Sequence, residues 1–303
     1  MTDVAVIGAG AIGAYYGAHL ARADHTVHFL ARSTAAELRQ HGLAIKSWRG
    51  DLAVDSIQAY SAPSQMPPCD LVLLATKATA NKTVFEQIRP VLKDGSQLVV
   101  MQNGFGAEPV LARMYPAVKL FAGLCFICSF RTDQPWVIQH TAYGRLSLAA
   151  LNPADQDSLE EIAQLFDQAG VDVERLGGVL EARLRKLVWN VPFNGLSVVL
   201  NATTGQLSRS PAARGAIAGL MAEVTGAAAA GGVEIEPSFA AKMMGTTDAM
   251  AAYNPSMRLD YLAGRPLEID AIYWNVINWA AGLGYAMPAC SLLARQLEYL
   301  SQP

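Results

Sequence analysis

The chain has 303 residues, of which 52% are hydrophobic and 16% charged, so it can bury a large core and is not a disordered chain. Its net charge of −3 at pH 7, with no run of Lys or Arg, leaves none of the basic surface with which proteins hold nucleic acid or anionic membranes. The length is sufficient for two domains of ordinary size.

The N-terminal segment MTDVAVIGAGAIG lacks a basic region and a cleavage site, so we expect no signal peptide. Residues 187–208 and 271–294 carry no formal charge, but both segments contain Asn, Gly and Pro. We interpret them as buried helices and not as membrane spans. Most of the four cysteines lie scattered in apolar runs, which is typical of reduced thiols, and we therefore expect a cytoplasmic protein.

Strands and helices alternate through the first part of the chain, which predicts a parallel sheet with helices on both faces. The expected strands are 3–10, 25–32, 69–77, 96–104, 120–131, 136–142, 144–151 and 171–176, with a hairpin at 42–57 and helices at 11–23, 81–92 and 155–170. After Val179 helical patterns dominate. A boundary near residue 178 therefore divides the chain into an α/β domain, residues 1–178, and an all-helical domain, residues 179–303.

A glycine-rich turn follows the first expected strand and opens the first helix. It fits the pattern G-x-G-x-x-G and consists of Gly8, Ala9, Gly10, Ala11, Ile12 and Gly13. In such a turn the first glycine permits the tight bend, the second lets the backbone approach a pyrophosphate, and the third lets helix and strand pack closely. Within a strand–turn–helix–strand unit, this pattern predicts a Rossmann-type dinucleotide-binding domain.

The end of the second expected strand indicates which dinucleotide is bound. An NAD site usually has an acid there for the ribose 2′-hydroxyl. Here Arg32 occupies the place, Ser33 and Thr34 follow, and no acid appears before Glu37. A guanidinium with hydroxyl groups suits a 2′-phosphate, so the sequence favours NADP(H).

Two further strand ends are expected at the same edge of the sheet, where open α/β sheets bind their ligands. Lys77 follows one of them and can neutralise a phosphate, whereas Asn103 follows the other and can bridge cofactor and substrate. Cys125 and Cys128 have a C-x-x-C spacing, but in a strand these positions point to opposite faces. No second pair completes a zinc set, and we expect no metal site.

The segment RLRKLVWNVPFNGLSVVLN, residues 183–201, begins as a helix with a polar face in apolar surroundings. Lys186, Asn190 and Asn194 follow one another at four-residue intervals, and side chains at this spacing share a helix face. Pro192 removes a backbone hydrogen bond and predicts a kink between the two asparagines. Taken alone, such a lysine is most often a residue whose charged end reaches water.

With these pieces the chain resembles the 2-dehydropantoate 2-reductase, or ketopantoate reductase, family along nearly its whole length. The matching segments are VIGAGAIG, the strand end with Arg32, Thr76-Lys77, QNG at 102–104, RKLVWNVPFN, NPSMRLDYLAGRPLEID and AAGLGYAMP. The resemblance implies a helical second domain, a substrate cleft between the domains, and reduction of the 2-keto acid ketopantoate to pantoate by NADPH, a step toward pantothenate and coenzyme A.

The resemblance also implies roles for individual residues. The family's proton donor matches Lys186, and the glutamate near that lysine and the nicotinamide ribose matches Glu268. The carboxamides that contact the substrate match Asn190 and Asn194, and the serine that holds the substrate carboxylate matches Ser256. The asparagine shared by cofactor and substrate matches Asn103, and a small residue lining the cofactor matches Ser129. The residue types fit the reaction, because hydride transfer leaves negative charge on the keto oxygen, which an ammonium can stabilise and protonate.

Some positions depart from the family pattern. Tyr273 and Trp274 stand where members commonly have Asn-Gly, while Ala289 and Thr204 stand where members commonly have asparagines. These departures leave open another branched 2-keto acid as the substrate. A 3-hydroxy-acid-type dehydrogenase and a non-catalytic NADP(H)-sensing protein are the further alternatives. The apolar stretch 272–285 fits either a homodimer surface or burial inside the protein.

Overall fold

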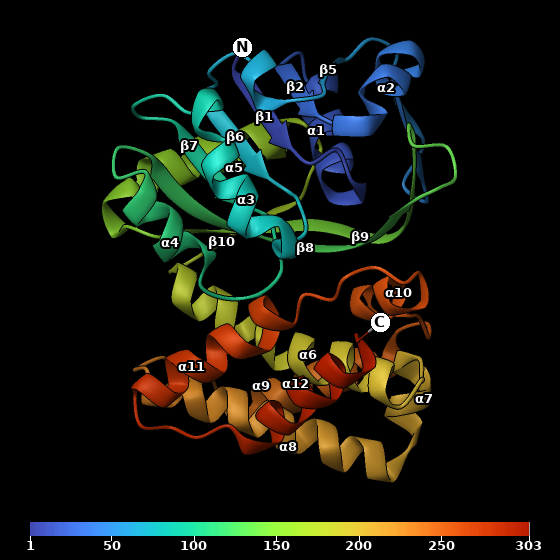
Figure 1. Cartoon of the computed structure of the whole chain (residues 1–303), viewed down its shortest axis with the longest axis vertical. Helices are drawn as coiled ribbons and strands as arrows, with labels where there is room; N and C mark the ends of the chain where they lie inside the picture. The colour runs from blue at the N-terminus through green and yellow to red at the C-terminus, as the bar shows by residue number, and fades with distance from the viewer. Residues whose placement is uncertain (303) are drawn as a thin grey trace. The chain divides into compact units, whose positions relative to one another are not determined.

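The computed structural model describes residues 1–302 and divides the chain into two compact units (Figure 1). The first unit contains Met1–Gln102 and Ala107–Val179. The second contains the chain from Leu180 onward and also the short segment Asn103–Gly106. The prediction of a single boundary near residue 178 did not include this short segment, which belongs with the helical unit.

Within residues 1–302, ten strands form one sheet in the first unit. They are β1 (Asp3–Ile7), β2 (Thr26–Leu30), β3 (Leu43–Ser47), β4 (Leu52–Val54), β5 (Gln58–Tyr60), β6 (Leu71–Leu74), β7 (Gln97–Val100), β8 (Lys119–Arg131), β9 (Val137–Ala150) and β10 (Val173–Leu176). The strands β5-β2-β1-β6-β7-β8 are parallel neighbours in this order. This is the order of a doubly wound dinucleotide-binding sheet, and it confirms the predicted α/β class.

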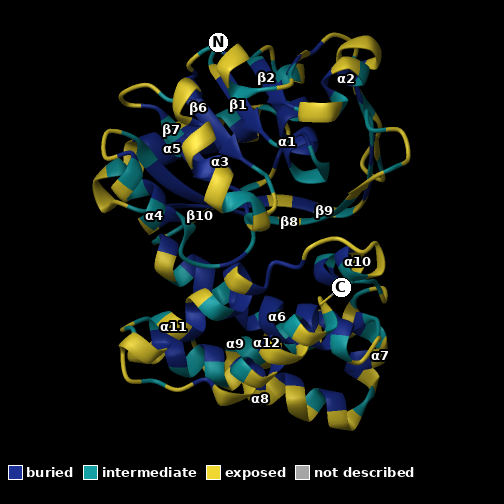
Figure 2. Ribbon diagram, in the orientation of Figure 1, coloured by how far each residue is buried: buried dark blue, intermediate teal, exposed yellow. Residues whose placement is uncertain are grey.

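Helices cover both faces of this sheet because β1 alternates its side chains between two apolar cores. Val4 and Val6 pack in the core that contains side chains of α1, α2 and α5, whereas Ala5 and Ile7 pack with α3 and α4. The central strands β1, β6 and β7 are accordingly mostly dark blue in Figure 2. The helices of this unit are α1 (Ala11–Arg22), α2 (Ala35–His41), α3 (Asn81–Gln87), α4 (Ala107–Met114) and α5 (Gln156–Gln168), with single 3₁₀ turns η1 (Arg32–Thr34), η2 (Pro63–Gln65), η3 (Ala78–Ala80), η4 (Arg89–Val91) and η5 (Pro153–Asp155).

The prediction of two short strands at 136–142 and 144–151 is wrong, because one continuous strand, β9, runs through both. Tyr143 and Gly144 adopt φ angles of 64° and 119°, and the register against β8 shifts at Phe126/Ile127. The glycine thus forms a bulge inside the strand and does not end it. Along its other edge β9 pairs with β3 and then with β10.

The second unit is helical, as expected. Its elements are α6 (Val179–Val199), α7 (Thr204–Arg209), α8 (Pro211–Ala230), α9 (Ser238–Ala249), α10 (Ser256–Leu262), the π-helix η6 (Asp270–Trp274), α11 (Asn275–Gly282) and α12 (Pro288–Leu300). Each of α6, α8, α11 and α12 contributes to one apolar core. Among the described residues no helix combines the length and apolarity needed to cross a membrane. Most apolar side chains of 272–285 point into this core.

Candidate active site

The glycine turn has the geometry that a dinucleotide phosphate requires. Gly8 has a φ of 103°, and the N–H groups of Gly8 and Ala9 donate to the carbonyl of Leu30 at 3.3 and 3.2 Å. A Cβ on Gly13 would overlap the Gly8 carbonyl and lie 2.8 Å from Cγ1 of Val6. By contrast, apart from its own chain neighbours, no atom of the described residues lies within 4 Å of a Cβ built on Gly10. The open space beside Gly10, at the start of α1, therefore fits the pyrophosphate of a dinucleotide.

Two predicted cofactor residues lie at the same edge of the sheet as the glycine turn. Arg32 lies two residues after Leu30, the last residue of β2, and the glycine turn is hydrogen-bonded to Leu30. The side chain of Arg32 is exposed, and its φ angle is 48°. Lys77 follows β6 and is exposed, and its neighbour Thr76 lies 2.9 Å from a Cβ built on Gly8. A non-glycine residue with positive φ is uncommon, and such strain is concentrated at binding sites.

Ser129 lies on the half of β8 that pairs with β9 and no longer with β7. Its Oγ atom is buried and has no hydrogen-bond partner among the residues that the structure describes. Cys125 and Cys128 lie on the same strand, and neither forms a disulfide. Residues 1–302 contain no group of three or more His, Cys, Asp or Glu side chains that could hold a metal ion.

Helix α6 carries Lys186, Asn190 and Asn194, and it continues through Pro192. Lys186 is half-buried, whereas the two asparagines are buried, with 5% and 2% of their surface exposed. The Nδ2 atom of Asn190 has no hydrogen-bond partner within residues 1–302. A buried amide without a partner is costly, so this donor is available to a ligand.

The structure brings Asn194 beside Ser256, the two residues that the resemblance assigns to contacts with the substrate. Oδ1 of Asn194 accepts a hydrogen bond of 3.2 Å from the backbone N–H of Met257, in the first turn of α10. Because Oδ1 accepts this hydrogen bond, the orientation of the Asn194 amide is fixed, and its Nδ2 is the atom that can donate to another group. Ser256 is the first residue of α10 and is half-buried.

Glu268 is buried and lies two residues before the π-helix η6, on which the Asn103–Gly106 segment is docked. The N–H of Phe105 donates to the carbonyl of Ala271 at 2.8 Å, and Nδ2 of Asn275 donates to the carbonyl of Phe105 at 2.8 Å. Gly104 has a φ of 102°, and a Cβ there would lie 2.5 Å from the Ala271 carbonyl oxygen. Asn103 thus belongs to the same unit as Lys186. Asn275, which holds this segment, was not predicted, because in the sequence it is simply an asparagine inside an apolar run.

The bulky departures from the family pattern do not crowd the polar face of α6. Tyr273 is fully buried in the helical core, and Trp274 donates from Nε1 to Glu298 at 2.7 Å with Arg295 over its ring. At Ala289 the carboxylate of Glu223 accepts from the backbone N–H groups of Ala289 and Cys290 at 2.8 and 2.9 Å. Glu223 thereby caps the start of α12.

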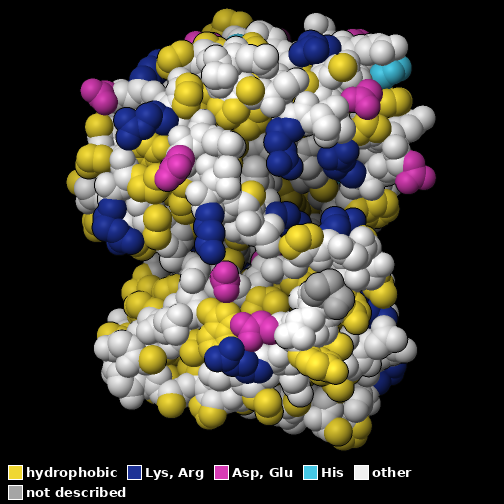
Figure 3. All heavy atoms as spheres, viewed as in Figure 1, with side chains coloured by type: hydrophobic (Ala, Val, Ile, Leu, Met, Phe, Trp, Pro, Cys, Tyr) yellow, Lys and Arg dark blue, Asp and Glu magenta, His cyan; other side chains and the backbone are white. Residues whose placement is uncertain are grey.

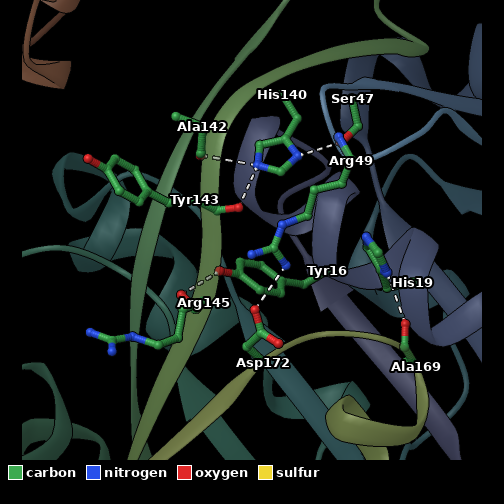
Figure 4. A network of polar contacts seen from close by, with 10 residues as sticks. All are labelled: Tyr16, His19, Ser47, Arg49, His140, Ala142, Tyr143, Arg145, Ala169 and Asp172. Carbon is green, nitrogen blue, oxygen red and sulfur yellow. Dashed lines mark hydrogen bonds and ion pairs between the residues drawn. The ribbon is translucent and has the colours of Figure 1, made fainter. Parts of the chain in front are cut away.

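A second polar cluster in the first unit lies at the opposite end of α1 from the glycine turn, and sequence reasoning missed it (Figure 4). His140 Nε2 lies 3.1 Å from the carbonyls of both Ala142 and Tyr143, and its Nδ1 lies 2.9 Å from the hydroxyl of Ser47. Carbonyls only accept, so Nε2 carries the proton and Nδ1 accepts from Ser47. The neutral ring thus holds the bulge of β9.

We expect the protein to lose stability as the pH falls below about 6.5, the ordinary histidine value. Burial is the main cause of the lowered pKa values of His19, His25, His28 and His140. A histidine with a lowered folded-state pKa binds more protons when unfolded, so the free energy of unfolding decreases as the pH falls through the unfolded value. Thermal melts across this window should show a smaller pH slope in His140→Gln than in the exposed-site control His41→Gln. Equal slopes would contradict this role of His140.

Charge is dispersed over the visible surface of the first unit. Figure 3 shows its Lys and Arg side chains scattered singly between uncharged residues. Many of the charged groups are paired, as in Lys46–Asp51 at 2.7 Å and Arg175–Glu160 at 3.0 Å. This face accordingly has no continuous basic patch of the kind that binds nucleic acid.

A doubly wound sheet with a glycine turn of the dinucleotide-binding pattern, joined to a helical unit with a lysine and carboxamides on one face, defines a nucleotide-dependent oxidoreductase of the Rossmann class. The family model described as ketopantoate reductase PanE/ApbA matches residues 4–153, and the model of its C-terminal part matches residues 178–300. The chain belongs to the ketopantoate reductase family.

Individual relatives agree with this assignment. A 2-dehydropantoate 2-reductase of Nostoc sp. is 38% identical over 301 residues, covering 98% of this chain and 94% of the relative. The crystal structure of 2-dehydropantoate 2-reductase from Geobacter metallireducens superposes with a TM-score of 0.94 at 38% identity, covering 98% and 99% of the two chains. A ternary structure of D-mandelate dehydrogenase with NADH and anilino(oxo)acetate shares the fold, with a TM-score of 0.89 at 20% identity over 99% and 98% of the chains.

Proposed function

We propose that the chain reduces 2-dehydropantoate, also called ketopantoate, to pantoate with NADPH. The observation that supports this most directly is the polar face of α6, where Lys186 shares a helix face with two buried asparagines and Asn194 is bonded beside Ser256. The Nostoc relative carries the name of this reaction at 38% identity. The glycine turn, Arg32 and Lys77 would hold NADPH, which supplies the hydride when bound.

In this proposal the residues of the second unit have different roles in the reduction of the keto acid. Lys186 donates a proton to the keto oxygen as negative charge develops there, and its ammonium stabilises that charge beforehand. Asn190, Asn194 and Ser256 donate hydrogen bonds to the substrate, because a 2-keto acid presents carboxylate and carbonyl oxygens that only accept. We assign to Glu268 the role of favouring the charged form of the ammonium, as a carboxylate near it would. Asn103 bridges substrate and cofactor.

The second candidate is reduction of a different branched or bulkier 2-keto acid on the same residues. The D-mandelate dehydrogenase structure has the same fold and holds anilino(oxo)acetate, a larger 2-keto acid analogue. Against it stands the position of Tyr273 in the helical core, because a fully buried ring does not itself line a pocket for the substrate.

The test is to identify the product. Purified protein with NADPH and ketopantoate should form one pantoate for each NADPH oxidised, as measured by mass spectrometry and absorbance at the nicotinamide band. Oxidation of NADPH without formation of pantoate would contradict the proposal. A higher kcat/KM for an aromatic or longer branched 2-keto acid would favour the second candidate.

A further inference from the structure

Helix α6 contains a weak point between its two predicted substrate asparagines. Pro192 has no N–H to donate to the carbonyl of Val188, and its ring crowds that carbonyl. Asn190 lies before this point and Asn194 after it. A proline inside a helix lets its two halves change direction relative to each other, so the relative aim of these two amides depends on what holds the turn around Pro192.

One side chain from another element holds this turn. The hydroxyl of Tyr273, in the π-helix η6, donates a hydrogen bond of 2.8 Å to the carbonyl of Val191. Val191 lies next to Asn190 and three residues before Asn194. Tyr273 is fully buried, and burial raises the pKa of its hydroxyl well above the usual value. The hydroxyl is therefore protonated at neutral pH and acts as a donor there.

The helix makes room for this hydroxyl with a glycine. A Cβ on Gly195 would overlap the Tyr273 oxygen and would lie 2.7 Å from Cδ2 of Leu293. Glycine within a helix is unfavourable compared with alanine, so its presence at this contact fits a requirement for the tyrosine oxygen. A phenylalanine at this position would keep the aromatic ring in the core and would lose the hydroxyl that bonds to α6.

We propose that Tyr273 is a positioning residue for reduction of the 2-keto acid. By bonding the Val191 carbonyl it fixes the turn that Pro192 weakens, and so it aims Asn190 and Asn194 at the same substrate. This inference rests on the proposed function, because it assigns to these asparagines the substrate contacts described above. Tyr273 is fully buried in the helical core, so in this proposal it acts through α6 and not on the substrate directly.

The test compares Tyr273→Phe with Tyr285→Phe in steady-state kinetics with ketopantoate. Tyr285 is the control, because its hydroxyl end also lies against a helix glycine, Gly226 of α8, and this helix carries no predicted site residue. Misplacing substrate contacts slightly costs up to about a hundredfold in rate. We expect the Tyr273 variant to raise the KM for the keto acid at least about tenfold while the Kd for NADPH and the melting temperature stay near wild type. Tyr285→Phe should match wild type throughout.

Two further variants separate positioning from a general loss of packing. In an Asn194→Ala background the Tyr273→Phe change should have a much smaller effect, because residues that act through one another are not additive. Gly195→Ala should raise the same KM, since its Cβ displaces the hydroxyl without changing Tyr273. An unchanged KM in an active Tyr273→Phe enzyme, or an equal effect with and without Asn194, would overturn the proposal. A wild-type enzyme inactive with every 2-keto acid would instead overturn the proposed function, and this inference with it.

Discussion

Replacing Lys186 with alanine is expected to lower kcat by at least about a hundredfold, the usual contribution of a positioned general acid. The lysine is half-buried on α6, on the face it shares with Asn190 and Asn194. Without its ammonium, the charge on the developing alkoxide is neither stabilised nor protonated by the protein. Binding of NADPH should be unchanged, because the glycine turn and Arg32 belong to the other unit.

The neighbouring cation Arg185 gives a matched control for this variant. Its guanidinium is paired with Glu181 at 2.8 Å and with Glu236 at 3.0 Å, so it is already neutralised within the second unit. Arg185→Ala should keep kcat within about threefold of wild type, since partly exposed ion pairs contribute little. Stopped-flow measurement of NADPH oxidation and fluorescence titration of NADPH supply the two readouts. Near-normal turnover in Lys186→Ala would remove the lysine from the mechanism.

Replacing Arg32 with alanine is expected to weaken NADPH binding about ten- to a hundredfold and NADH binding hardly at all. The magnitude is that of losing a hydrogen bond from a charged donor to a charged acceptor. Arg32 stands at the end of β2 with a φ of 48°, and alanine adopts this conformation with similar strain. The comparison therefore isolates the side chain and not the backbone.

Arg39, one helix further along, is the control for that second variant. Its Nη1 donates to the carbonyl of Ala59 at 2.8 Å, which directs the guanidinium to the protein itself. Arg39→Ala should leave the ratio of the Kd values for NADPH and NADH as in wild type. Titration of both dinucleotides by nicotinamide fluorescence gives that ratio. Equal losses for NADPH and NADH in Arg32→Ala would contradict assignment of a 2′-phosphate to this residue.

The Rossmann half of the fold could be predicted from local patterns. The tight turn at Gly8 and the close contact at Gly13 depend on residues within a few positions along the chain or on the adjacent strand. The continuity of β9 was missed because it depends on Tyr143, a bulky residue that adopts a φ of 64° inside the bulge. Nothing in the pattern of polar and apolar residues distinguishes such a bulge from a loop.

The contacts that complete the second unit could not be predicted, because they join residues far apart in sequence. The bond from Phe105 to Ala271 draws the segment after β7 onto the helices, although its sequence resembles an ordinary strand end. The sequence shows that Tyr273 is bulky, but the direction in which its side chain points depends on the π-helix that contains it. A one-residue insertion of this kind rotates the side chains that follow it, and it has no local signature.

The most direct test of reduction by NADPH is a comparison of kcat/KM values for a panel of 2-keto acids with the wild-type enzyme. The panel should include ketopantoate, shorter and longer branched 2-keto acids, and phenylglyoxylate, with NADPH oxidation followed by absorbance. We predict the highest kcat/KM for ketopantoate and a preference for NADPH over NADH. Tight binding of NADPH with no oxidation in the presence of any of these acids would contradict a catalytic role and indicate an NADP(H)-sensing protein.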